Sequence, residues 1–213
     1  MQLPASVSKC SKLLAIAGVA HMYESTRMAN RALGDALSML ESSTFAIDSE
    51  LVSRVLATCR RWIDQPEVLT RARQLLTNAM RDKRADPFPV ILVAEECDDR
   101  HLLGWGYYYI LKHQDADWQS DARLRQIDKR RLLAGAVALS KRWQSICDQW
   151  SIEMTQARTP SWAIFDKIDN VPITPLAGRN RGYGSYQARP GADVKAQIER
   201  ELYGFFDPEP WGL

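Results

Sequence analysis

Three side chains that can bind a metal or move protons lie close together in the sequence. They are Cys97, His101 and His113. Zinc needs three or four nitrogen, sulfur or oxygen ligands in a tetrahedral arrangement. The spacing CxxxH with a distant second histidine is not a standard ligand pattern, so we predict no metal site. As an alternative we keep a small enzyme near His101 and His113, with a site drawn from Glu95, Glu96, His101, Tyr107 and His113.

Motifs of the common enzyme classes are absent from the sequence. The chain has no P-loop, no GxGxxG after a strand, no GxSxG elbow, no kinase signature and no HExxH. Its three histidines leave few centres for histidine-based catalysis. We therefore favour a non-enzymatic protein without a cofactor.

Basic side chains concentrate in the N-terminal part of the chain. Residues 1–84 contain 12 basic and 8 acidic residues. A basic helical surface is the electrostatic signature of nucleic-acid binding, although a solvated helix exterior explains the same residues. A second group lies at 121–131, where Asp121 and Asp128 alternate with arginines. The candidate contacts from these two groups are Arg54, Arg61, Arg81, Lys83, Arg84, Arg123 and Arg130.

Arginine alternates with glycine and tyrosine between residues 179 and 189. Arginine and tyrosine can stack on bases while arginine contacts phosphate. A packed loop with glycine turns and tyrosine anchors is the alternative. The candidate contacts in this segment are Arg179, Arg181, Tyr183, Tyr186 and Arg189. The net charge of +2 and the pI of 8.3 are low for a nucleic-acid-binding protein.

The last 55 residues differ in composition from the rest. Residues 159–213 contain 12 prolines and glycines and eight aromatic residues. This pattern predicts an extended aromatic arm that packs on the body or on a partner protein. It also contains a short helix with Asp193 as N-cap, ended by Gly204. The candidate partner contacts are Phe205, Phe206 and Trp211, because aromatic side chains dominate interface hot spots.

Helical periodicity dominates the first 158 residues. Residues 5–43 predict one helix, or two because Gly18 and Gly34 weaken it. Asp48-Ser49-Glu50 begins the next helix, and Glu67 opens a third. Apolar residues at heptad-like spacing predict a long helix over 121–157, which includes Leu132, Leu139, Trp143, Ile146 and Trp150.

One segment favours strands instead. Val90–Val93 is a β-branched run after two prolines, and residues 102–111 contain three consecutive tyrosines. We predict a β-hairpin over 90–111, with a helix from Glu95 to His113 as the alternative. The predicted fold is therefore mainly α: a helical, bundle-like domain over 1–158 with a small hairpin, followed by the extended arm over 159–213.

The remaining features concern location and role. The four cysteines form no CxxC pair, which predicts reduced core thiols in a cytoplasmic protein, and no apolar run is long enough to span a membrane. The seven tryptophans, the extended arm and the seam formed by the apolar residues at heptad-like spacing in 121–157 favour a non-enzymatic subunit of a larger cytoplasmic protein or nucleoprotein assembly. The alternative is a DNA- or RNA-binding protein that uses the basic residues named above.

Overall fold

A computed structural model describes most of the chain and divides it into two compact units. The described residues are 5–42, 44–62, 64–114, 117–150, 160, 162–170 and 190–207. Unit 1 comprises Met1–Tyr109 and unit 2 comprises Ile110–Leu213. The predicted boundary at 158/159 adjoins residues outside the described ranges and stays a prediction.

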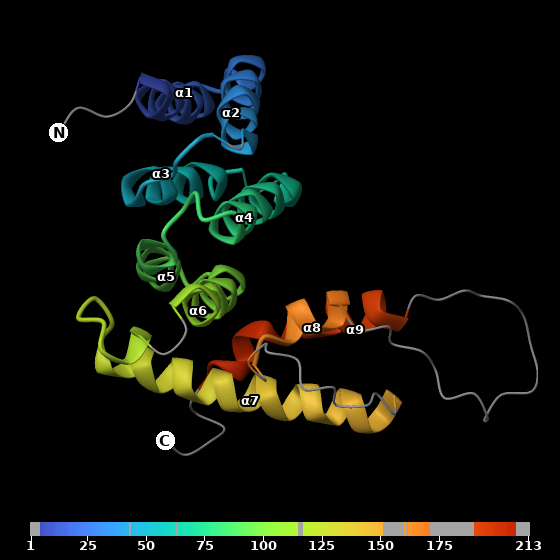
Figure 1. Cartoon of the computed structure of the whole chain (residues 1–213). Helices are drawn as coiled ribbons and strands as arrows, with labels where there is room; N and C mark the ends of the chain where they lie inside the picture. Colours follow the sequence, from blue (N-terminus) through green and yellow to red (C-terminus); the bar gives the residue numbers. More distant parts are fainter. Residues whose placement is uncertain are drawn as a thin grey trace, which may run out of the picture. The chain divides into compact units, whose positions relative to one another are not determined.

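Unit 1 is a stack of helix pairs (Figure 1). Helices α1, α3 and α5 follow one another on one side, and α2, α4 and α6 follow one another on the other. Within the stack α1 packs on α2 and α3, α3 packs on α4 and α5, and α2 packs on α4. The helices are α1 (Ala5–Met22), α2 (Thr26–Glu41), α3 (Ser49–Cys59), α4 (Pro66–Arg81), α5 (Pro87–Glu96) and α6 (Arg100–Gln114), the last of which continues into unit 2.

The segment over 5–43 contains two helices, which is one of the two alternatives that the sequence left open. The break falls at residues 23–25, where Glu24 adopts a left-handed φ of 58°. Gly18 and Gly34 both lie inside helices, so neither glycine ends one. The next helix begins after Asp48 as predicted, and the third begins at Pro66, one residue before the predicted start at Glu67. Asp48 accepts a hydrogen bond from the Leu51 amide at 2.8 Å, and Pro66 stands in the first turn of α4.

The predicted β-hairpin over 90–111 is wrong, because no strand occurs among the described residues and this segment forms α5 and α6. Two caps explain the helices. Asp86 accepts from the Phe88 amide at 3.1 Å beside Pro87, and Asp99 accepts from the Leu102 amide at 3.2 Å. Nearly every residue from 102 to 111 is buried, so packing overrides the β-propensity of the tyrosines.

Two loops connect the successive pairs of unit 1. Ile47 and Ala85 form an isolated parallel β-bridge, in which the Ile47 amide donates to the Arg84 carbonyl at 2.9 Å. The Arg84 guanidinium donates to the carbonyls of Leu40 and Phe45 at 3.1 and 3.2 Å. These bonds satisfy carbonyls at and after the C-terminal end of α2, and fix the spacing between the first two pairs.

Unit 2 is built on the long helix α7 (Gln126–Trp150), with α8 (Ile164–Asn170) and α9 (Pro190–Phe205) packed on it; the single-turn 3-10 helix η1 (Asp117–Gln119) precedes α7. The helix predicted over 121–157 begins only at Gln126. Of its apolar positions at heptad-like spacing, Leu132, Leu139, Trp143 and Ile146 are buried, whereas Ala136 is half-buried. Helix α9 includes the predicted short helix but extends through Gly204 to Phe205, so Gly204 does not end it.

Candidate functional site

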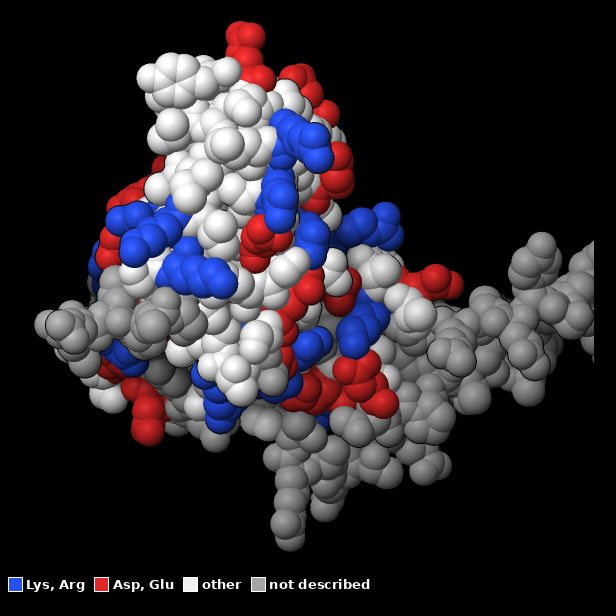
Figure 2. Space-filling model, turned by 90° about the horizontal axis from the view of Figure 1, so that it is seen from above, with Lys and Arg blue, Asp and Glu red and all other residues white. Residues whose placement is uncertain are grey.

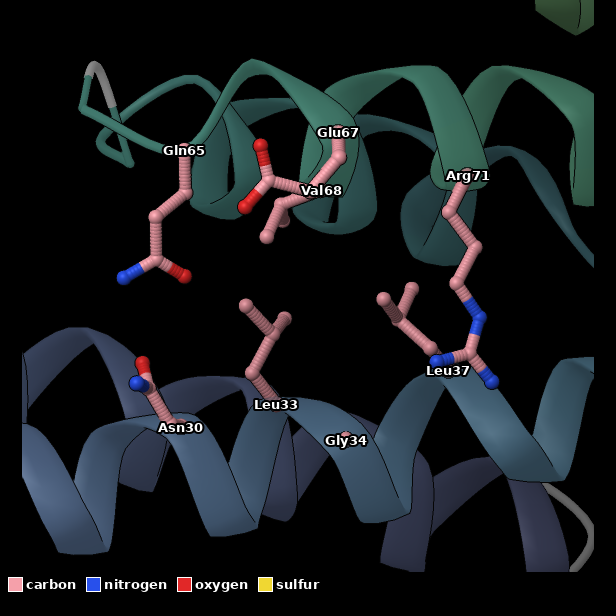
Figure 3. Close-up of a pocket in the computed structure, with 8 residues that line it drawn as sticks. All are labelled: Asn30, Leu33, Gly34, Leu37, Gln65, Glu67, Val68 and Arg71. Atoms are coloured by element: carbon pink, nitrogen blue, oxygen red, sulfur yellow. The ribbon is translucent and has the colours of Figure 1, made fainter.

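A groove lies between α2 and α4 in unit 1 (Figure 3). Its volume is about 270 Å³. Apolar side chains form its floor, and polar side chains from both helices stand along its edges. The lining residues are Asn30, Leu33, Gly34, Leu37, Gln65, Glu67, Val68 and Arg71.

The groove exists because α2 carries no side chain at Gly34. A β-carbon built there meets nothing within 4 Å, so open space lies above this position. Leu33 and Leu37 flank it, and Val68 reaches toward them from α4 (Figure 3). Both leucines are buried, whereas Val68 and Gly34 are half-buried. Val68 and the backbone at Gly34 are therefore the accessible apolar surface of the groove.

Two carboxamides face each other at one end of the groove (Figure 3). The Asn30 Oδ1 accepts a hydrogen bond from the indole Nε1 of Trp62 at 2.9 Å. Trp62 is itself stacked on His21, with ring centroids 4.5 Å apart. This arrangement fixes the Asn30 side chain and directs its amide N–H groups away from Trp62. Gln65, just before α4, lies opposite. A carboxamide offers both a donor and an acceptor, as a peptide group does.

The other end of the groove carries charge. Arg71 reaches from α4 toward α2, and its guanidinium pairs with Glu41 at 2.6 Å. That contact closes the end of the groove across both helices. Glu67, one turn before Arg71, is exposed and makes no ion pair within the described ranges. The unpaired charge at the rim is therefore negative.

A second groove, of about 380 Å³, lies on α7 in unit 2. Its lining includes Trp143 and Trp162. Residues 151–159 and 161, which adjoin Trp162 in the sequence, lie outside the described ranges. The α2–α4 groove combines apolar side chains with two carboxamides and a charged rim, so we take it as the candidate site.

Most of the basic candidates in unit 1 have structural partners. Arg54 pairs with Glu50 at 2.6 Å, and Arg81 pairs with Asp82 at 3.1 Å. Arg84 is occupied by the backbone carbonyls described above. The other two candidates, Arg61 and Lys83, are exposed. The Arg61 guanidinium lies 3.1 Å from the position of a β-carbon on Gly18, and Lys83 stands in a turn with φ of 58°.

The basic candidates of unit 2 divide in the same way. Arg123 pairs with Asp121 at 2.8 Å, and that contact lowers the pKa of the Asp121 carboxyl. Arg130 is exposed. Arg179, Arg181, Tyr183, Tyr186 and Arg189 lie outside the described residues. Figure 2, which looks onto the α1–α2 end of unit 1, shows acidic and basic side chains interspersed on that face, and phosphate binding favours a surface of a single sign.

The aromatic partner candidates lie at the end of α9. Phe206 is fully buried, and its ring fills the space beside Gly135 of α7. Phe205 is half-buried. In these positions Phe206 serves the core of unit 2. Trp211 lies outside the described residues, so its role as a partner contact stays a prediction.

The residues considered for metal binding or catalysis occupy separate places. Cys97 ends α5, and its carbonyl accepts a hydrogen bond from Arg60. His101 and His113 lie at opposite ends of α6, about 18 Å apart along its axis. Partial burial, and then the Arg73 guanidinium, lower the pKa of His101. Tyr107 is buried. Among the described residues no three His, Cys, Asp or Glu side chains gather where they could hold a metal ion.

The groove was not predicted from the sequence, in which Gly34 stood out only as a weak point in a helix and neither Asn30 nor Gln65 stood out at all. The sequence does contain one signal: a helical glycine between two buried leucines marks a gap in the helix surface. Which neighbouring helix faces that gap depends on tertiary packing, which the sequence pattern does not contain.

None of the described helices combines the length and apolar character needed to cross a membrane. A comparison with protein-family models gives no match, and comparisons with curated proteins and with solved structures give none either.

Proposed function

We propose that this chain is a non-enzymatic protein-binding subunit of a larger cytoplasmic assembly, and that the α2–α4 groove binds a peptide segment of a partner protein. The observation that carries the proposal is the open space above Gly34, bounded by apolar side chains and by two carboxamides. Apolar anchors beside a few fixed polar groups are the usual composition of a recognition site.

The size of the groove favours a peptide over a small metabolite. Its volume of about 270 Å³ lies below the roughly 300–1,000 Å³ of typical small-molecule pockets. That space holds a few side chains. Asn30 and Gln65 supply hydrogen bonds to the peptide backbone, because their donors and acceptors match those of a peptide group.

The charge at the rim of the α2–α4 groove indicates which charge the partner segment carries. Glu67 is exposed and unpaired within the described residues, while Arg71 is already neutralised by Glu41. The partner segment therefore carries a lysine or arginine near its apolar anchors. This contact is exposed, so it contributes modestly to affinity and weakens with salt.

Nucleic-acid binding is less well supported. Arg54, Arg81 and Arg123 are paired with carboxylates, and Arg84 is paired with carbonyls. A nucleic-acid-binding surface instead leaves its cations free for phosphate. The test below includes an oligonucleotide arm for this alternative.

The test is a selection of displayed random peptides on the immobilised full chain. We expect enriched peptides with two apolar residues and a nearby cation. They bind the wild type and the control Gly204→Leu, but not Gly34→Leu, whose new side chain fills the groove. Gly204 is a suitable control because a β-carbon there also meets nothing within 4 Å.

Three results would contradict the proposal. One is a selection without enrichment. The second is enriched peptides that bind Gly34→Leu as well as the wild type. The third is binding of a labelled single-stranded oligonucleotide that weakens steeply with salt and is unchanged in Gly34→Leu, which would assign the chain to the nucleic-acid alternative.

A further inference from the structure

The outer face of α1 carries an exposed apolar stripe. Ile16 and Val19 lie on α1, and Tyr23 lies one residue after its end, where its amide still donates to the Val19 carbonyl at 3.1 Å. Their surfaces are 46%, 53% and 79% exposed. Lys9 and Lys12 continue the same line toward the N-terminal end of the helix. The opposite face of α1 is buried against unit 1.

This stripe lies at the end of the stack of helix pairs. Each pair buries its apolar faces against the next pair, so the outer face of a terminal pair is usually polar. Here two further large apolar side chains, Met22 at the end of α1 and Met28 in the first turn of α2, are more than half exposed. Figure 2 looks onto this end of unit 1 and shows uncharged surface bordered by charged side chains. A surface of this kind indicates a binding partner.

We propose that this face binds a second copy of the chain, with the two α1 helices packed antiparallel about a two-fold axis. The axis lies midway between Ile16 and Val19. Ile16 of one copy then packs on the partner's Val19, and the reverse contact forms by symmetry. The apolar side chains of the stripe thus form the centre of the contact.

The ends of the stripe are complementary under the same symmetry. Lys12 precedes Ile16 by four residues, and Tyr23 follows Val19 by four. An antiparallel arrangement therefore places Lys12 over the partner's Tyr23, with the partner's Glu24 beside it. Lys12, Tyr23 and Glu24 form no ion pair or ring contact with one another within the described residues of one copy. A cation over a tyrosine ring and beside a carboxylate is favourable.

The size of the stripe sets the strength of the contact. Five large apolar side chains, each about half exposed or more, bury on the order of 600 Å² per copy, below the roughly 800 Å² per partner of a standard interface. We therefore expect a dimer that forms at micromolar concentrations and dissociates on dilution.

The test is sedimentation velocity of the full chain from low to several hundred micromolar. The wild type shifts from monomer to dimer over this range, and Val19→Lys stays monomeric because it places a charge in the centre of the contact. Leu92→Lys is the matched control. Leu92 is 45% exposed on α5, so its replacement leaves the dimer unchanged.

A charge swap distinguishes a second copy from other occupants. Lys12→Glu weakens the dimer at least several-fold, and the double variant Lys12→Glu/Glu24→Lys restores it, because the exchanged charges meet only across the two-fold axis. A wild type that is monomeric at every concentration overturns the proposal, and so does a dimer that Val19→Lys leaves intact. Flotation of monomeric wild type with anionic phospholipid vesicles, lost in Val19→Lys, would assign the face to a membrane instead.

Discussion

The ring of Phe206 occupies the space that a side chain on Gly135 would need. A β-carbon built on Gly135 lies 2.1 Å from two carbons of that ring. The glycine therefore lets α9 approach α7 closely, and Phe206 is fully buried in the contact. A residue that lowers helix propensity is retained here because the closest approach of two helices requires it.

Gly135→Ala should destabilise unit 2. The added methyl group cannot fit unless Phe206 moves, and overpacking of this kind costs about 2 kcal/mol in the free energy of unfolding. Urea unfolding followed by tryptophan fluorescence measures the change. Gly204→Ala is the control on α9, where nothing lies within 4 Å, and it should be neutral or stabilising. Equal stability of the two variants would contradict the packing described for Phe206.

Gly34 and Gly106 should respond in opposite directions to alanine. The position above Gly34 is empty, so Gly34→Ala gains helix propensity and raises the free energy of unfolding by about 0.5–1 kcal/mol. A β-carbon on Gly106 would lie 2.4 Å from the Cγ2 of Ile91, so Gly106→Ala lowers the free energy of unfolding. Thermal unfolding of both variants checks the sign of each change. A destabilised Gly34→Ala would mean that the groove is not open.

Among the carboxylates of unit 1, Asp99 should cause the largest loss of stability when it is replaced by alanine. It is fully buried, pairs with Arg73 at 2.9 Å and accepts from the Leu102 amide at the start of α6. Asp99→Ala removes an N-cap and leaves Arg73 without its partner, which we expect to cost about 3 kcal/mol. Denaturant unfolding gives the value. Glu50→Ala breaks an exposed pair with Arg54 and should change stability by less than about 0.5 kcal/mol.

The cysteines should differ in reactivity. Burial raises the pKa of the Cys10 thiol to about 11 and that of Cys59 to about 12. Cys147 is also buried, whereas Cys97 is partly exposed. Native protein treated with a thiol reagent at pH 8 should therefore be labelled at Cys97 first, as peptide mass spectrometry would show. Rapid labelling of Cys59 in the native state would contradict its placement.

The same thiols make stability depend on pH. Their pKa values are higher in the folded chain than in the unfolded chain, where thiols titrate near 9. Their contribution to stability is therefore complete below about pH 9 and decreases as the pH rises toward 11 and 12. Cys59→Ala should flatten this alkaline decrease in unfolding experiments between pH 8 and 10.

The sequence predicted long periodic helices well. The start of α3 follows from Asp48 before the helix, and the start of α4 near Glu67 and most of the buried positions of α7 follow from apolar spacing, which are local signals. The prediction of a β-hairpin was wrong because it relied on the β-propensity of the segment. Two helix N-caps, Asp86 beside Pro87 and Asp99, indicate helices instead. Those caps were visible in the sequence.

The candidate site was harder to predict, because it depends on which helices become neighbours. Gly34 and Val68 are brought together only by the packing of α2 on α4. Arg84 likewise resembles a surface cation in the sequence, yet it donates to carbonyls of Leu40 and Phe45, about forty residues earlier. Whether an arginine is structural or exposed therefore depends on its partners elsewhere in the chain, which the residue type alone does not reveal.

The most direct measurement is the dissociation constant of a selected peptide, determined by isothermal titration calorimetry on three proteins: wild type, Gly34→Leu and Gly204→Leu. Binding in the α2–α4 groove predicts at least a tenfold weaker interaction for Gly34→Leu, about 1.4 kcal/mol or more, with unchanged affinity for Gly204→Leu and no loss of thermal stability in either variant. Equal dissociation constants for all three proteins would show that the groove does not bind the peptide.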